Sequence, residues 1–286
     1  MSECSSSGSC SGNCASCGSR EKEECALNEV LGRIGKKLVV MSGKGGVGKS
    51  TVAANLAYTL ARSGRKVGLL DIDVHGPSIP RMLGVEDVRP EVDENEKIIP
   101  ADANGVKVIS IGFMLDSDDA PVVWRGPVKI GVIRQLITDV AWGDLDVLVI
   151  DCPPGTGDEP LTVCQTVAGK GAAAVIVTTP QKVSASDVSR SINFCKQLNF
   201  PIAGLLENMS GFVCPKCGEI TQIFASGAGE MLAEKYGVRF LGKLPIDPAI
   251  CAGGDAGNPF SSGNSPASDA FRAAAAGILE EMDKNA

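Results

Sequence analysis

The chain has few aromatic residues and no long apolar run, and both absences narrow what it can be. Aromatic residues make up 4% of the 286 positions, so small aliphatic side chains must fill the core that a 44% hydrophobic content supports. No apolar run approaches the ~20 residues that a membrane-spanning helix needs. Residues 1–35 are polar and lack the apolar stretch of a signal peptide. We therefore expect a cytoplasmic protein with no membrane partner.

Basic residues and histidine are also scarce. Lysine and arginine number 27 against 34 acidic residues, a formal net charge of −7. A sequence-independent nucleic-acid binder presents a basic face, so we expect no nucleic-acid partner. The single histidine, His75, has no second histidine with which to share a metal, and we interpret it as a loop residue. The eleven cysteines are then the metal ligands to consider.

Strand-like and helix-like segments alternate from residue 36 onward. This alternation predicts an α/β fold, a mostly parallel sheet with helices on both faces, in which ligands bind at the carboxyl ends of the strands. We expect an edge hairpin over 98–111. The other expected strands are 37–42, 67–71, 145–150, 173–178, 202–207 and 239–244, and the expected helices are 49–62, 128–140, one from 159, 185–198 and 268–286.

The composition divides the chain into two parts. Residues 1–35 are rich in serine, glycine and cysteine and then in charge, with too little apolar content to fold alone. They are predicted to form a flexible, metal-binding, cysteine-rich tail. Residues 36–286 are predicted to form a single domain that contains a Cys-x-x-Cys motif at 214–217.

Residues 43–51, GKGGVGKST, fit the phosphate-binding pattern G-x-x-x-x-G-K-[ST]. A strand-like run precedes them and an apolar-faced helix follows, which makes the domain a predicted P-loop NTPase. The glycines let successive N–H groups point at one anion, and the helix N-terminus adds partial positive charge. Lys49 is expected on the β- and γ-phosphates of ATP and Ser50 on Mg²⁺. The predicted nucleotide-binding residues here are Gly43, Lys44, Gly45, Gly46, Val47, Gly48, Lys49, Ser50 and Thr51.

Two acidic clusters follow predicted strands, DIDVHGPS from residue 71 and DCPPGTGD from residue 151. Asp151 has the position of a carboxylate near Mg²⁺. Asp73 is placed to orient the attacking water or to accept its proton. Together with Lys44 and Lys49, these two aspartates are the predicted catalytic residues.

Three residues farther along the chain are expected to complete the nucleotide pocket. Asn208 follows the strand-like run IAGLLE, where its side-chain amide could read the adenine edge. Pro245 and Asp247, within LPIDP, could line the same pocket.

Cys214 and Cys217 lie in CPKCG, a tight turn that points two thiolates at one ion. Two thiolates cannot fill a four-coordinate site. The simplest completion is the same pair from a second subunit on a two-fold axis, which predicts a homodimer. The metal could be zinc or a [4Fe–4S] cluster, and the motif does not decide between them.

The N-terminal tail holds five further cysteines, of which four could form a second site. Cys14-x-x-Cys17 is the clearest candidate pair, and Cys25 with either Cys4 or Cys10 could complete a four-thiolate site. The alternative is a set of redox-labile cysteines without a metal.

These motifs together resemble known protein families. The extra lysine, Lys44, makes the loop similar to the deviant Walker A motif of the MinD/ParA/nitrogenase iron protein class, in which it reaches the partner subunit's phosphates. With DIDVHGPS, DCPPGTGDEP, ENMSGFVCPKCG and LPIDP, residues 36–260 resemble the Mrp/ApbC iron–sulfur cluster carrier ATPases. The resemblance implies a homodimeric cytoplasmic ATPase that holds a transient [4Fe–4S] cluster through Cys214 and Cys217 of both subunits and passes it to apo-proteins. The tail resembles that of the cytosolic scaffold branch, although its cysteine spacing departs from that pattern.

Three other functions fit parts of the chain. A MinD/ParA-type positioning ATPase fits the first half, but the acidic balance and the CPKC motif argue against it. A reductase component would need a permanently ligated cluster, which a flexible cysteine pair does not favour. A P-loop ATPase with a structural zinc site is the third, and metal analysis decides it.

Overall fold

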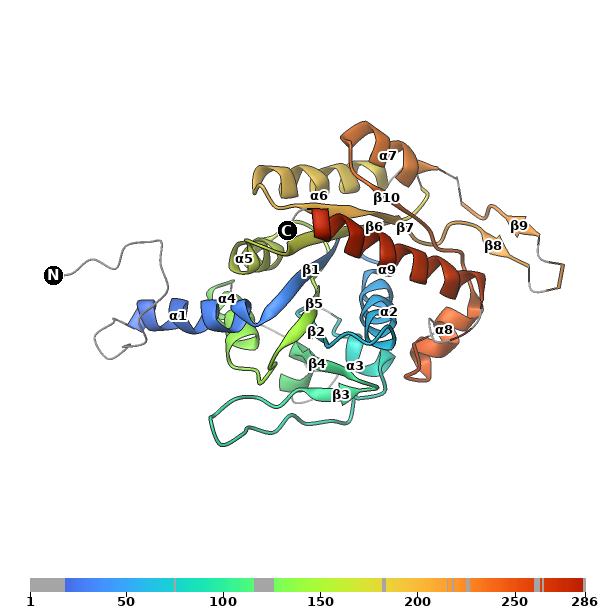
Figure 1. Ribbon diagram of the computed structural model, residues 1–286. Helices are drawn as coiled ribbons and strands as arrows, with labels where there is room; N and C mark the ends of the chain where they lie inside the picture. The colour runs from blue at the N-terminus through green and yellow to red at the C-terminus, as the bar shows by residue number, and fades with distance from the viewer. Residues whose placement is uncertain are drawn as a thin grey trace.

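A computed structural model describes residues 19–74, 76–115, 126–181, 184–214, 216–217, 219–224, 227–259, 263 and 265–284. Its centre is an eight-stranded sheet in the order β10-β7-β6-β1-β5-β2-β4-β3 (Figure 1). Neighbouring strands are parallel except β3 and β4, which form the expected antiparallel edge hairpin. The strands are β1 (Ile34–Ser42), β2 (Val67–Asp71), β3 (Ala101–Ala103), β4 (Val106–Ser110), β5 (Leu145–Asp151), β6 (Ala172–Thr178), β7 (Ile202–Glu207) and β10 (Phe240–Lys243).

Helices cover both faces of this sheet, which confirms the α/β prediction. Strand β1 shows why two faces are needed, because Leu38 belongs to one apolar cluster, whereas Val39 and Met41 belong to another on the opposite face. Side chains alternate along a strand, so an unbroken apolar run requires cover on both sides. The helices are α2 (Lys49–Arg62), α3 (Ile79–Met82), α4 (Gly126–Thr138), α5 (Asp158–Val167), α6 (Ala185–Gln197), α7 (Ala228–Tyr236), α8 (Pro248–Asp255) and α9 (Pro266–Lys284).

The structure differs from the sequence-based expectation near the N-terminus. Instead of an unfolded tail up to residue 35, helix α1 spans Ser19–Gly32. Leu27, Val30 and Leu31 are partly buried against the apolar cluster beneath α4 and α5. Packing of one apolar edge stabilises this helix, a tertiary effect that average composition does not report. Cys25 lies on α1, half-buried, while Cys4, Cys10, Cys14 and Cys17 lie outside the described residues.

A small hairpin of β8 (Phe212–Val213) and β9 (Ile220–Thr221) stands apart from the main sheet. It carries the predicted cysteine pair and projects from the body of the protein, and in the view of Figure 1 α1 lies at the other end. Among the described residues, no helix is both long and apolar enough to cross a membrane.

Candidate nucleotide site and cysteine pair

The loop of residues 43–48 connects the end of β1 to the start of α2, as the motif requires. Gly46 and Gly48 have φ values of 74° and 81°, a left-handed conformation that glycine adopts without strain. A Cβ on Gly48 would lie 2.3 Å from the Asn208 side-chain nitrogen, so there is also no space for a side chain. Asn208 Nδ2 donates to the carbonyl of Val47 at 2.9 Å and fixes the loop from the end of β7.

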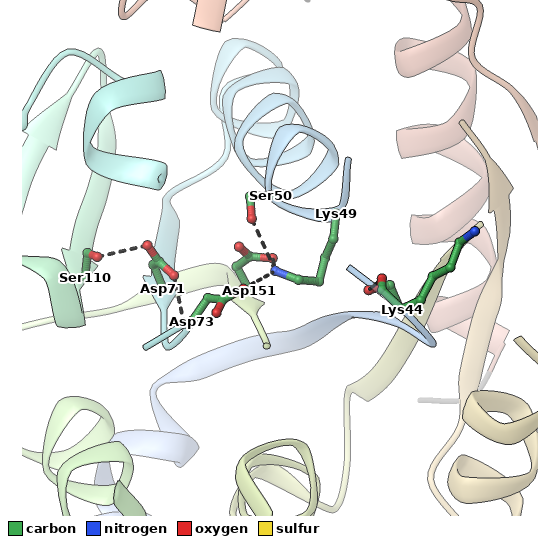
Figure 2. Close-up of polar contacts among 8 residues, drawn as sticks. Lys44, Lys49, Ser50, Asp71, Asp73, Ser110 and Asp151 are labelled. Atoms are coloured by element: carbon green, nitrogen blue, oxygen red, sulfur yellow. Dashed lines mark hydrogen bonds and ion pairs between the residues drawn. The ribbon is translucent and has the colours of Figure 1, made fainter. Parts of the chain in front are cut away.

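Lys49 lies among carboxylates that come from two neighbouring strands (Figure 2). Its Nζ is 2.6 Å from Asp151 Oδ1 and 3.5 Å from Asp73 Oδ2. The lysine is 6% exposed and Asp151 is fully buried. Burial disfavours the charged lysine, but the attraction of Asp151 outweighs it and raises the pKa of Lys49. Burial raises the pKa of Asp151, and Lys49 opposes that shift. The structure therefore brings together three of the predicted catalytic residues.

Sequence reasoning missed the role of Asp71, which is fully buried at the end of β2 and lies beside Asp151 in the sheet register. It accepts hydrogen bonds from Ser110 Oγ at 2.9 Å and from the backbone N–H of Asp73 at 3.0 Å. Burial, and then repulsion from Asp151, raise the pKa of Asp71 to about 8. The raised pKa favours the protonated carboxyl of Asp71, whose hydrogen bond from the backbone N–H of Asp73 positions that residue. The signal was present, since both aspartates end apolar strands that this topology makes neighbours.

The donor atoms at this point fit a magnesium ion. Within the described part of the chain, Asp151 Oδ2 is buried without a hydrogen-bond partner, and a buried carboxylate oxygen in that state favours a cation. Ser50 Oγ belongs to the same group of side chains, because it lies 3.2 Å from Lys49 Nζ, which is in turn 2.6 Å from Asp151 Oδ1. Carboxylate and hydroxyl oxygens are the ligands that Mg²⁺ prefers.

Lys44 behaves differently from Lys49. Its side chain extends away from the carboxylates (Figure 2), and its Nζ is 3.5 Å from Gln181 Oε1. The side chain is half-buried at the rim of the loop. The predicted contact between Lys44 and a partner's phosphates stays a prediction.

Two adjoining cavities meet at the loop. The smaller, of about 220 Å³, is lined by loop residues with Asp73 and Pro154. The larger, of about 470 Å³, lies beside Gly48 and is lined in part by Asn208, Pro245 and Asp247, the three residues predicted to complete the pocket. Asp247 also caps α8, because its Oδ1 accepts from the N–H of Ala249 at 2.9 Å. A volume of this order suits a small organic ligand.

Cys214 and Cys217 lie at the turn of the β8–β9 hairpin, half-buried and exposed respectively. The backbone N–H groups of Cys217 and Lys216 bond the Cys214 sulfur and lower its pKa, which favours the metal-binding thiolate. In the ranges that the structure describes, no three candidate metal ligands gather at one point. Within those ranges, the pair therefore has no third His, Cys, Asp or Glu ligand beside it. By contrast, burial raises the pKa values of Cys164 and Cys195 to about 12, which makes these two thiols poor ligands.

A strand, a glycine-rich loop and a helix, with a lysine and carboxylates at neighbouring strand ends, define a P-loop nucleotide-binding protein. A family model described as ParA, NUBPL iron-transfer P-loop NTPase, matches residues 33–279. The chain belongs to this family.

Individual relatives agree with this assignment. An iron-sulfur cluster carrier protein of Methanocaldococcus jannaschii is 45% identical over 284 residues, covering 96% of this chain and 98% of the relative. A cytosolic Fe-S cluster assembly factor NUBP2 homolog of Trichoplax adhaerens is 48% identical over 249 residues, covering 83% and 91%. The solved nucleotide-binding protein of Archaeoglobus fulgidus in complex with ADP is similar at a TM-score of 0.75 and 42% identity, covering 84% of this chain and 93% of that one.

Proposed function

We propose that this protein is an ATP-hydrolysing carrier that binds a [4Fe–4S] cluster and transfers it to apo-proteins. The observation that carries the proposal is the presence of a P-loop site and an incomplete cysteine pair in one domain, connected by only the six residues from Asn208 to Val213. Relatives named as iron-sulfur cluster carriers and cytosolic assembly factors support the cargo and a cytoplasmic location.

The chain's own residues account for nucleotide hydrolysis. The loop N–H groups and Lys49 bind the phosphates of ATP, and the larger cavity receives the nucleoside against Asn208, Pro245 and Asp247. Asp73 orients the attacking water or accepts its proton. Ser50 and Asp151 would hold Mg²⁺, which neutralises charge on the phosphate oxygens.

The cluster requires two copies of the chain. Cys214 and Cys217 supply two thiolates, and the same pair of a second copy supplies the other two. In this homodimer Lys44, which extends away from its own carboxylates, reaches the partner's phosphates. Exposed ligands on a short hairpin favour a cluster that can be released.

We also propose a second cluster on the N-terminal cysteines, held by four of Cys4, Cys10, Cys14, Cys17 and Cys25. Only Cys25 lies among the described residues, on α1. In Figure 1 this helix is far from the β8–β9 hairpin, which supports a separate site.

The decisive experiment is anaerobic reconstitution of the full chain with iron and sulfide, followed by metal analysis and sizing of the product. Cys214→Ala should lower the iron content by about four atoms per dimer, the content of one cluster. Cys251→Ala, which removes another exposed cysteine, is the matched control and should leave the iron content unchanged. Unchanged core-cluster binding in Cys214→Ala, zinc in anaerobically purified protein, or a monomer loaded with nucleotide and iron would each contradict the proposal.

A further inference from the structure

Glu207 is a fully buried carboxylate at the end of β7 that the proposed hydrolysis does not use. Both of its oxygens are engaged. Oε1 accepts from the hydroxyl of Ser210 at 2.7 Å, and Oε2 accepts from the backbone N–H of Gly229 at 2.7 Å. Buried carboxylates are uncommon unless they are bonded in this way, so its position calls for an explanation.

The two bonding partners enclose the cysteine pair in the sequence. Between Ser210 and Gly229 lie residues 211–228, which we call the cysteine segment, and they include the β8–β9 hairpin with Cys214 and Cys217. One carboxylate thus holds both ends of this segment. The approach at the second end is close, because a Cβ on Gly229 would lie 2.9 Å from Glu207 Oε2. Gly229 is in the first turn of α7, where a negative charge is favourable.

The same carboxylate is adjacent to the nucleotide site. Asn208, the next residue, donates to the P-loop carbonyl of Val47 and lines the larger cavity. A second connection runs through Ile246, which lines that cavity and whose N–H donates to the carbonyl of Gly211 at 2.7 Å. The peptide bond between Glu207 and Asn208, together with these hydrogen bonds, therefore connects the lining of the larger cavity to both ends of the cysteine segment.

We propose that Glu207 is a positioning residue that couples nucleotide binding at Asn208 to the geometry of Cys214 and Cys217. The inference deepens the proposed function and rests on it, because it gives the nucleotide a route by which to change the affinity of the cysteine pair for metal. Nucleotide and metal then alter each other's binding by the same factor.

The test uses Co²⁺ as the probe of the cysteine pair. Binding to the full chain is detected by the thiolate absorption of Co²⁺, with and without a non-hydrolysable ATP analogue. The signal of Cys214→Ala is subtracted as the contribution of other sites. In the wild type we expect the analogue to change the Co²⁺ affinity by roughly tenfold, within the range usual for coupled sites. In Glu207→Ala, the ratio of the Co²⁺ affinities measured with and without the analogue should fall to about one.

Two variants make the result specific. Glu207→Gln should retain part of the coupling, because its amide oxygen can accept from Gly229 while its amide nitrogen donates to Ser210. Glu230→Gln is the matched control. Glu230 is an exposed glutamate in α7, the helix that contains Gly229, and it pairs with Lys243. The affinity ratio of this variant should equal that of the wild type. If Glu207→Ala fails to fold, Ser210→Ala removes one of the two bonds and should lower the ratio by a smaller factor.

Hydrogen exchange of residues 211–228 gives a readout that needs no metal. The analogue should change exchange of this segment in the wild type and not in Glu207→Ala. The coupling would be overturned if the analogue affected neither readout in the wild type. It would also be overturned if Glu207→Ala and Ser210→Ala both kept the affinity ratio of the wild type. If Co²⁺ binding in the wild type equals that of Cys214→Ala while the exchange result is as expected, the proposed metal site fails and the coupling stands.

Discussion

The nucleotide site and the cysteine segment are built in opposite ways, although a few residues separate them. At the nucleotide site, Asp71 and Asp151 end adjacent strands and are fully buried, and Lys49 is 6% exposed. The cysteine segment has strands of two residues each, and Ile220 in it is 62% exposed. Hydrolysis needs charged groups held in place before the reaction, whereas transfer of a cargo needs ligands that another protein can approach.

Changing Lys49 should have the largest effect, because it should abolish the function of the nucleotide site and leave metal binding by the cysteine pair intact. Lys49→Ala is expected to lower ATP hydrolysis by at least about a hundredfold, because it removes the positive charge that we propose faces the phosphates. Binding of Co²⁺ to the cysteine pair without nucleotide should be unchanged. Phosphate release and cobalt titration measure the two quantities, and Lys284→Ala, at an exposed lysine, is the control. A variant that keeps half of the wild-type hydrolysis would contradict the role of Lys49.

Thiol reactivity should show the same contrast without any mutation. At pH 8, Cys214 and Cys217 should react with an alkylating reagent at least about a hundredfold faster than Cys164 and Cys195. Burial raises the pKa of the latter two to about 12 and covers their sulfur atoms. Peptide mapping by mass spectrometry over time measures the rates. Equal labelling of all four in the native protein would show that the core opens readily.

A methyl group in the P-loop tests how tightly the nucleotide site is constrained. Gly48→Ala should weaken nucleotide binding about tenfold and destabilise the protein by about 1–3 kcal/mol, because alanine is strained at φ 81° and would meet the Asn208 side chain. Gly131→Ala is the matched control. It lies in α4 with open space around its Cβ, so it should bind nucleotide normally and gain about 0.5–1 kcal/mol. Nucleotide titration and urea unfolding measure both, and equal affinities would contradict the constraint.

A further expected effect concerns the proton on Asp71. Its folded pKa of about 8 exceeds the ordinary aspartate value of 3.8, so in that range of pH the native state holds a proton that the unfolded chain releases. The free energy of unfolding therefore falls as pH rises between these values. Asp71→Asn removes this dependence, and its stability relative to the wild type should rise between pH 5 and pH 8, by at most about 1.4 kcal/mol per pH unit. Urea unfolding at the two pH values measures it, and a constant difference would exclude the protonated carboxyl.

Much of the fold could be predicted from the sequence because the buried strands are continuous apolar runs and the phosphate loop has a fixed pattern. Helix α1 could not be predicted from the sequence, because only a few apolar side chains near its end pack on the domain. Helix α8 was also missed, because its two glycines, Gly253 and Gly254, are poor helix formers, and the cap from Asp247 compensates for them.

Within the site, the loop residues and Asp151 follow from motifs, but Glu207 does not. A glutamate at the end of a strand has no pattern that tells a bonded, buried carboxylate from a solvated one. Its role depends on Gly229, 22 residues later in the sequence, and only the folded chain brings the two together.

The ion pair between Lys49 and Asp151 has one more consequence. The charges of Lys49 and Asp151 offset each other inside the protein, with Asp73 as a second, more distant partner of the lysine. A magnesium nucleotide brings a divalent cation and a polyphosphate of larger negative charge, so in the proposed complex the phosphates would pair with Lys49 and the metal with Asp151. A nucleotide without its metal would pair with Lys49 and leave the buried Asp151 carboxylate without a counter-ion, so we expect the protein to bind the magnesium-bound form more tightly.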